Sequence, residues 1–203
     1  MKILIIPFPK AMWGGQRHPE QTERLKTAYE LWLEYDFMCG HDVTILCSSG
    51  LANSQGISLG QTLRQKIIQI SNESGMPPIP QSDVKTGEEE STHTGENIRF
   101  LKKFLEPGTE PDQNPRWDKV ICVTSPGFLF LPGHTARIRR LMRNIVPNLP
   151  VEVVPCKPYG SLPYRIMRGI TEFILIMMLW VDPQAKLLDR SREKRIADAA
   201  SKT

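Results

Sequence analysis

The sequence contains no apolar run long enough to cross a membrane. Its most apolar stretch, residues 170–181, is interrupted by Thr171 and Glu172 and falls short of the roughly 20 residues that a membrane helix needs. The N-terminus passes from Met1 and Lys2 directly into the short apolar run 3–6, without the small-residue cleavage site of a secretory signal peptide. These absences exclude a membrane-spanning class and predict a cytoplasmic protein.

Cysteine and histidine are scarce, and neither is spaced as a metal motif. The chain has four cysteines and four histidines, and none of them forms the close pairs of zinc or redox sites. Cys47 and Cys122 lie in apolar runs, so we expect them to be small buried hydrophobic residues in a reducing compartment. No metal is predicted. The remaining members of the two sets are Cys39, Cys156, His18, His41, His93 and His134.

The charge balance is only mildly basic, with 26 Lys and Arg against 22 Asp and Glu. The surplus lies mainly in residues 137–143 and 189–195, where acidic and apolar residues are interleaved with the basic ones. This pattern favours solvated helix faces over the broad basic stripe of a nucleic-acid interface. The glycine patterns of phosphate loops and of dinucleotide-binding turns are also absent.

What the sequence does contain is an alternation of short apolar runs with longer helical patterns. This alternation is typical of an α/β domain with a mainly parallel sheet. The length of 203 residues fits one domain, which we place at residues 1–182, followed by a charged C-terminal helix or tail at 183–203. Strands are predicted at residues 2–6, 42–47, 82–85 (a weak pattern), 119–124 and 151–154.

Helical spacing of apolar residues predicts the segments between these strands. Helices are expected at residues 20–35, 59–74, 98–105, 134–145 and 165–181, with a surface helix in 183–200. Residues 170–181 are apolar on nearly every side. We favour a core helix there, and a helix that faces a partner or a membrane surface is the alternative.

Four unusual loops follow the predicted strands. They comprise residues 7–18, 48–56, 88–97 and 125–134, and are rich in small and polar residues. Because ligands of open parallel sheets bind beyond the carboxyl ends of the strands, these loops should line one crevice. Taken singly, each signal has a structural alternative. Residues 48–50 are an anion nest or a strand-ending turn, and Thr94 and Asn97 are ligand contacts or a helix cap.

The order of the motifs resembles a known family. Residues 91–98, Ser-Thr-His-Thr-Gly-Glu-Asn-Ile, are similar to the Ser-Thr-Asn-Thr-x-Glu-Asn-Ala signature of the YdcF, SanA and ElyC family, also called domain of unknown function 218. Residues 75–77 resemble its Gly-Val-Pro, residues 45–50 its strand ending in Ser-Gly-Gly, and residues 120–125 with 134–137 its Val-Thr-Ser strand and His-x-x-Arg helix start. The resemblance covers roughly residues 1–180.

The chain departs from the family pattern at four places. Pro7-Phe8-Pro9 stands where the family has a glycine-rich turn, and Ser49 stands where a glycine is usual. Gly60 or its neighbours stand where an acidic residue is common early in the second helix, and residues 126–133 form a longer connection. The chain therefore resembles a divergent member. The resemblance implies a Rossmann-like three-layer sandwich of about five mainly parallel strands with helices on both faces. It also implies envelope-related physiology, with S-adenosylmethionine binding proposed for one relative and no settled catalytic mechanism.

Residue chemistry and resemblance together predict a site for a nucleotide-like or phosphorylated small molecule, with S-adenosylmethionine or an envelope precursor as candidates. Arginine, hydroxyl groups and turn N–H groups can hold a phosphate or carboxylate. His134 and Glu96 are the candidate catalytic residues for transferase or hydrolase chemistry. The competing hypothesis is a non-catalytic partner or membrane-surface protein that docks through residues 170–181. The candidate binding residues are Ser48, Ser49, Gly50, Ser91, Thr92, Thr94, Asn97, Thr124, Ser125 and Arg137.

Overall fold

The computed structural model describes residues 1–9, 19–48, 57–87, 94–105, 117–127 and 133–183. Its centre is a sheet of five parallel strands in the order β3-β2-β1-β4-β5. The strands are β1 (Lys2–Pro7), β2 (Asp42–Cys47), β3 (Val84–Thr86), β4 (Lys119–Thr124) and β5 (Val151–Pro155). The predicted α/β class with a parallel sheet is therefore confirmed. The weak strand prediction at 82–85 lies two residues early, because Gln81–Asp83 form a 3-10 turn after Pro80.

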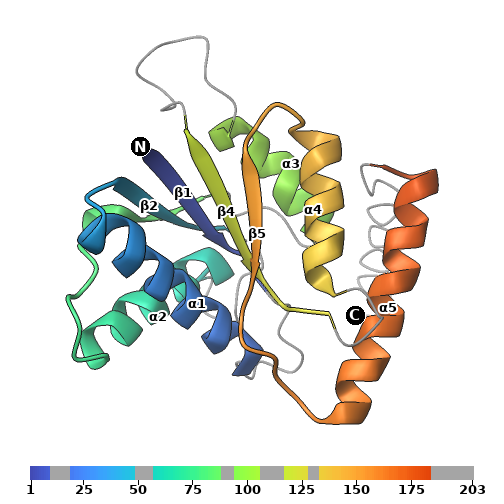
Figure 1. Cartoon of the computed structure of the whole chain (residues 1–203), viewed down its shortest axis with the longest axis horizontal. Coiled ribbons are helices and arrows are strands. Elements are labelled where there is room, and N and C mark those ends of the chain that lie inside the picture. Colours follow the sequence, from blue (N-terminus) through green and yellow to red (C-terminus); the bar gives the residue numbers. More distant parts are fainter. Residues whose placement is uncertain (10–18, 49–56, 88–93, 106–116, 128–132, 184–203) are drawn as a thin grey trace, which may run out of the picture.

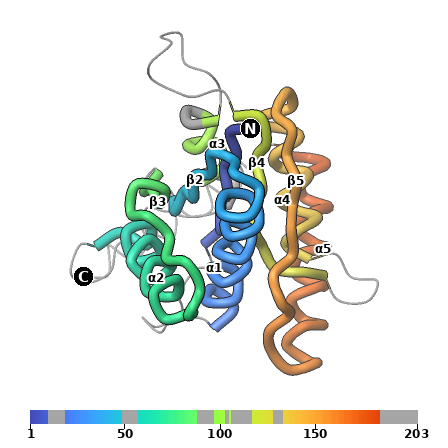
Figure 2. The backbone as a smooth tube through the Cα atoms, turned by 60° about the vertical axis from the view of Figure 1, so that its left-hand side comes forward, coloured from blue at the N-terminus to red at the C-terminus, as the bar shows by residue number. Residues whose placement is uncertain are grey.

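Helices cover both faces of the sheet. Figures 1 and 2 show α1 (Pro19–Trp32) and α2 (Leu59–Glu73) on one face, and α3 (Thr94–Leu105) and α4 (His134–Ile145) on the other. Helix α1 continues as a π-helical segment, Leu33–Met38, so the helix predicted to end at residue 35 is longer. The last described helix, α5 (Leu162–Val181), begins three residues earlier than predicted and packs outside α4.

Successive side chains of the strands point to opposite faces of the sheet, so the core consists of two clusters. In β1, Ile3 and Ile5 pack with α1 and α2, while Leu4 and Ile6 pack with α3 and α4. Side chains of a strand alternate between its two faces, so a strand that is buried on both sides must be apolar throughout. Cys47 and Cys122 are both fully buried in strands, which confirms their predicted role as small hydrophobic residues.

Helix α5 corrects one sequence-based expectation. The core helix favoured at residues 170–181 is wrong, because most apolar side chains of α5 point away from the protein. Its buried residues are Gly169, Glu172 and Leu179. In the described part of the chain, no helix is both long and apolar enough to pass through a membrane. The predicted surface helix at 183–200 falls almost entirely outside the described residues.

Candidate functional site

The strand order places a topological switch point between β1 and β4. The chain leaves β1 toward α1 on one face of the sheet and leaves β4 toward α4 on the other. Adjacent strands that diverge in this way open a crevice at their carboxyl ends, which is the usual ligand site of such sheets. Phe8 and Ser125 lie here, directly after β1 and β4.

Arg24 of α1 is the centre of this region. Its side chain is 1% exposed. Nη1 donates to the carbonyl oxygens of Phe8 and Pro9 at 2.6 and 3.1 Å. Nε and Nη2 donate to Oγ of Ser125 at 3.2 and 2.5 Å. Burial lowers the pKa of Arg24, and the charge of Glu20 opposes that shift. The guanidinium thus joins the ends of β1 and β4 to α1.

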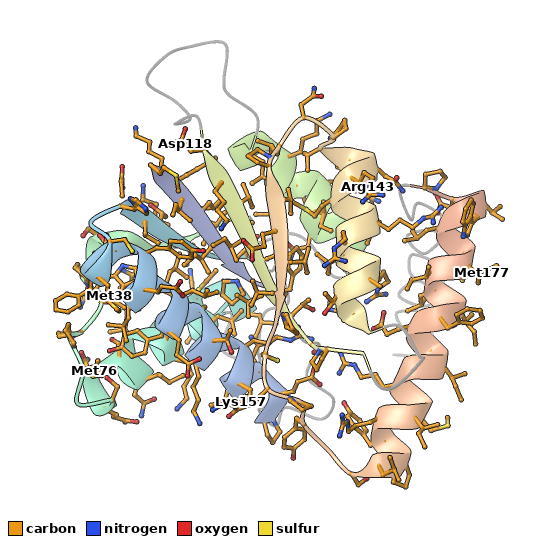
Figure 3. All side chains as sticks on the ribbon, viewed as in Figure 1. Met38, Met76, Asp118, Arg143, Lys157 and Met177 are labelled. Carbon is orange, nitrogen blue, oxygen red and sulfur yellow. The ribbon has the colours of Figure 1, made fainter. Side chains whose placement is uncertain are left out.

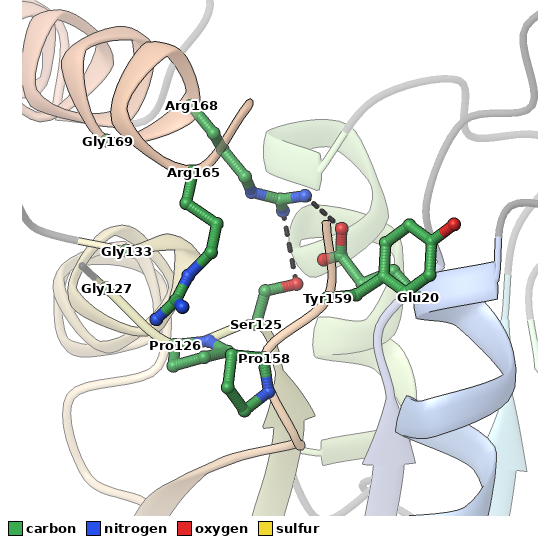
Figure 4. A pocket seen from close by; sticks show the side chains of 10 residues that line it. All are labelled: Glu20, Ser125, Pro126, Gly127, Gly133, Pro158, Tyr159, Arg165, Arg168 and Gly169. Atoms are coloured by element: carbon green, nitrogen blue, oxygen red, sulfur yellow. Dashed lines mark hydrogen bonds and ion pairs between the residues drawn. The ribbon is translucent and has the colours of Figure 1, made fainter. Parts of the chain in front are cut away.

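Glu20 links this centre to α5. Its Oε1 accepts a hydrogen bond from Nη2 of Arg24 at 2.9 Å, and its Oε2 pairs with Nη1 of Arg168. Arg168 also donates from Nη2 to Oγ of Ser125 at 3.1 Å. Figure 4 shows the two contacts of Arg168. Buried charges are tolerated when they are paired and hydrogen-bonded. Two guanidinium groups around one carboxylate leave an excess of positive charge.

A pocket opens next to this cluster, between the ends of β4 and β5 and the first turns of α5. Its cavity volume is about 20 Å³, and it opens to solvent. In Figure 4, Arg165 and Arg168 extend from α5 toward Pro126 and Ser125. We call it the switch-point pocket, and its described lining residues are Glu20, Ser125, Pro126, Gly127, Gly133, Pro158, Tyr159, Arg165, Arg168 and Gly169.

Gly133 lets two backbone segments approach each other closely at the wall of this pocket, its own and that of Pro126 and Gly127. A Cβ atom at this position would lie 2.2 Å from the backbone nitrogen of Gly127 and 2.2 Å from the carbonyl carbon of Pro126. Only glycine fits such an approach. Gly133 is also the N-cap residue of α4 and supplies no side-chain cap. The positive end of the α4 dipole therefore begins at the pocket wall.

Asn97 and Ser48, two of the candidate binding residues, contact each other at the end of β2, away from the switch-point pocket. Nδ2 of Asn97 donates to the carbonyl oxygen of Ser48 at 2.9 Å, and both residues are buried. Oδ1 of Asn97 has no hydrogen-bond partner within the described residues. The amide therefore ties the first turn of α3 to β2. Among the residues that line the switch-point pocket as described, neither appears.

His134 and Thr124 form a second buried pair. Oγ1 of Thr124 and Nδ1 of His134 share a short hydrogen bond, and the histidine ring meets Phe8 edge-on with centroids 6.5 Å apart. His134 is 3% exposed. This arrangement holds the start of α4 against the ends of β1 and β4. The predicted catalytic histidine lies beside Gly133 of the pocket wall and is not itself in the described lining.

Arg137 faces α5. Its Nε lies 3.0 Å from Oε2 of Glu172, an ion pair between a half-buried arginine and a buried glutamate without the alignment of a hydrogen bond at these atoms. Burial lowers the pKa of Arg137, and Glu172 opposes this shift. Since Glu172 stands in the apolar stretch of α5, Arg137 neutralises it and joins the two helices. Of the predicted binding residues that the structure describes, Ser125 is the one that lines the pocket.

The other candidates lie outside the described residues. These are Ser49, Gly50, Ser91 and Thr92, and the side chains of Thr94 and Glu96, whose backbone opens α3.

Sequence reasoning missed Glu20, Arg24, Arg165 and Arg168. A signal was present for two of them: Glu20 and Arg24 are four residues apart, and Arg24 directly precedes Leu25 on the buried face of α1. A charged pair on an apolar helix face indicates a buried polar cluster. Arg165 and Arg168 precede the apolar half of α5. A charge so close to an apolar run likewise indicates a buried polar cluster.

A second hollow, with a cavity volume of about 180 Å³, lies at the other end of α4, next to the start of β5. Arg139 and Arg143 line it together with Met142, Val146, Pro147, Leu149 and Val151. It is at the opposite end of the strands from the switch point. Within the described part of the chain, no group of three or more His, Cys, Asp or Glu side chains is arranged to hold a metal ion.

Comparison with protein-family models, with curated proteins and with solved structures found no match to this chain.

Proposed function

We propose that the protein binds a small phosphorylated or nucleotide-like anion at the open mouth of the switch-point pocket. The observation that carries this proposal is the charge of the lining, where Arg165 and Arg168 stand against the carboxylate of Glu20. Because Arg24 also pairs with Glu20, the local sum is positive. Guanidinium groups bind phosphate oxygens through charge-assisted, often bidentate hydrogen bonds.

Two further features support an anionic ligand. The N-terminus of α4 meets the pocket wall at Gly133, so its dipole favours negative charge there. Tyr159 and Pro158 supply an apolar surface beside the arginines, against which a base or sugar ring can pack. A ligand with one charged end and one planar or cyclic end suits this combination.

The same chemistry ranks the candidate ligands. S-adenosylmethionine has no phosphate and carries a sulfonium cation, so the arginines give it less stabilisation than they give a phosphorylated compound. We therefore expect nucleotides and sugar phosphates to bind more tightly than S-adenosylmethionine. Tighter binding of the phosphorylated compounds would indicate that the pocket is positively charged.

We propose ligand binding without transferase or hydrolase chemistry by His134 and Glu96. Nδ1 of His134 is engaged by Thr124, and the ring is buried behind the pocket wall. A general base must reach the proton that it removes. The carboxylate that does reach the pocket, Glu20, is paired with two arginines.

We also propose that the chain is a divergent member of the YdcF, SanA and ElyC family and that it is cytoplasmic. The ordered motifs between residues 45 and 137 and the parallel α/β sheet support the family assignment. The four cysteines are free thiols, which supports a reducing compartment.

Isothermal titration calorimetry with inorganic phosphate, nucleoside mono- and diphosphates, sugar phosphates and S-adenosylmethionine tests the binding proposal. The variant is Arg165→Gln, which removes one pocket charge and keeps the Glu20 pairs. Loss of a charge-assisted hydrogen bond is worth about 1.5–3 kcal/mol, so the affinity for the best phosphorylated ligand should fall at least about tenfold.

Arg139→Gln is the matched control, because it removes an arginine of α4 that lies in the other hollow. It should leave the affinity unchanged. The proposal is overturned if no phosphorylated compound binds. It is equally overturned if Arg165→Gln and Arg139→Gln bind the ligand as tightly as the wild type.

A further inference from the structure

Helix α5 is built with its charges inside and its apolar side chains outside. Arg168 pairs with Glu20 and Glu172 pairs with Arg137, so these charges face the body of the protein. Between residues 166 and 181, every exposed position of the helix is apolar except Thr171. Surface helices of globular proteins normally show the reverse pattern. An inverted helix of this kind needs something to cover it.

The apolar side chains form one continuous face along α5. We call this the outer face of α5, and its ten members are exposed by 38% to 81%. Figures 1 and 3 show α5 at the outer edge of the molecule, with Met177 directed away from the body. The members are Leu162, Ile166, Met167, Ile170, Phe173, Ile174, Met177, Met178, Trp180 and Val181.

The size of this face matches a protein interface. With a large apolar side chain at roughly 200 Å² of surface, the exposed fractions correspond to about 1,000 Å². The largest apolar patch of a typical monomer is about 300–600 Å². A standard stable interface buries about 800 Å² on each partner. The outer face therefore has the area of a standard interface.

The spacing of the face indicates that the partner is another helix. Ile170, Phe173, Met177 and Trp180 follow one another at intervals of three, four and three residues. This alternation is the seam along which two helices interlock their side chains. A lipid surface requires an apolar face but no such seam.

We propose that a second copy of this chain occupies the outer face of α5, which makes the protein a dimer. The seam carries no charge, so two identical faces meet without like-charge repulsion across a two-fold axis. Arg140 lies with its guanidinium 4.0 Å from the ring centroid of Trp180 and so borders the seam. The inward side of the same helix lines the switch-point pocket with Arg165 and Arg168. Dimer contacts therefore hold the helix on which two pocket arginines stand.

The test is the mass of the full chain in solution, measured by sedimentation equilibrium and light scattering. The wild type should run at twice the chain mass of 23.1 kDa. Met177→Glu and Phe173→Glu each bury a carboxylate in the seam and should weaken the dimer at least tenfold, which leaves monomers at the same concentration.

Met76→Glu is the matched control. Met76 is 56% exposed and Met177 is 50% exposed, but Met76 follows α2 on the far side of the molecule. This variant should remain a dimer. Circular dichroism spectra should be the same in all variants, because the substituted side chains are outside the core.

Three outcomes overturn the proposal. The first is a wild type that stays monomeric at every concentration, and the second is a dimer that both seam variants leave intact. The third is a monomer that floats with anionic lipid vesicles and loses this property in Met177→Glu, which would identify a lipid surface as the occupant. Because none of these measurements involves a small ligand, they are independent of the binding proposal.

Discussion

Arg24 and Ser125 are 101 positions apart in sequence and are joined by two hydrogen bonds from one guanidinium group, from Nε at 3.2 Å and from Nη2 at 2.5 Å. The contact spans the switch point, since Arg24 belongs to α1 and Ser125 follows β4. The same guanidinium holds the carbonyl of Phe8 after β1. The crevice in which a ligand would sit therefore has a rigid, hydrogen-bonded base.

Arg24→Met should destabilise the protein by about 3–5 kcal/mol, because it leaves carbonyl groups and the Glu20 carboxylate buried with fewer partners. Urea denaturation followed by circular dichroism measures this change. The double variant with Glu20→Gln should cost less than the two single variants added together, since each substitution removes the partner of the other. Strict additivity would show that the pair is not energetically coupled.

Asn97→Ala should lower the free energy of unfolding by about 1–3 kcal/mol. The substitution removes the amide that donates to Ser48 and leaves a buried carbonyl oxygen without that donor. Thermal and urea denaturation both report it. Ser82→Ala is a useful control, because the hydroxyl of Ser82 donates to Asp83 at the surface. If the two variants are equally stable, the amide of Asn97 has no structural role.

Gly133→Ala should be much more damaging than Gly40→Ala. At Gly133 the new methyl group would overlap backbone atoms of Pro126 and Gly127, which cannot move aside as a side chain can. At Gly40 the space is open, and the cost is the positive φ of 67°, about 1–2 kcal/mol. Denaturation midpoints of the two variants compare these effects. The same midpoint for both would contradict the close approach at the pocket wall.

Native alkylation should modify Cys39 and spare the other three cysteines. Cys39 is exposed, whereas burial raises the pKa of Cys47 to about 12 and also raises the pKa values of Cys122 and Cys156. A raised thiol pKa lowers the fraction of reactive thiolate near neutral pH. Mass spectrometry after iodoacetamide treatment should find one label in the native protein and four in urea. Rapid native labelling of Cys47 would contradict the burial of β2.

Lys119→Met should destabilise the protein at neutral pH and have less effect at alkaline pH. A hydrogen bond to Glu152 and a second one to Tyr35 raise the pKa of Lys119. A folded-state pKa above the unfolded value of about 10.4 gives stability that is complete below that value and is lost as the pH rises through the folded one. Urea denaturation across this range checks the trend. A constant difference between variant and wild type would contradict it.

The fold was largely predictable because its signals are local. Alternating apolar runs and helical spacing located all five strands and most helix boundaries within a few residues. The buried cysteines of β2 and β4 were predictable for the same reason. The π-helical extension of α1 and the turn that delays β3 were not, because both depend on how the chain packs after the element ends.

The site was less predictable. Motif order selected Ser48, Asn97, Thr124, Ser125, His134 and Arg137 as candidate ligand-binding or catalytic residues, and of these six described residues Ser125 is the one that lines the switch-point pocket. Their partners were not readable from sequence. Thr124 engages His134, Asn97 engages Ser48, and Arg137 engages Glu172, so potential ligand groups are paired with one another.

The sequence by itself determined the alternation of strands and helices, the parallel α/β class and the presence of polar loops after the strands, because these follow from the period of apolar residues and from turn chemistry. Only the tertiary structure decided that Glu20, Arg24 and Arg168 converge on Ser125, and that α5 turns its apolar side outward. Such contacts join residues tens to over a hundred positions apart. These contacts depend on the strand order and on which face of each helix packs against its neighbour. A local segment of the sequence determines neither the strand order nor the packed face.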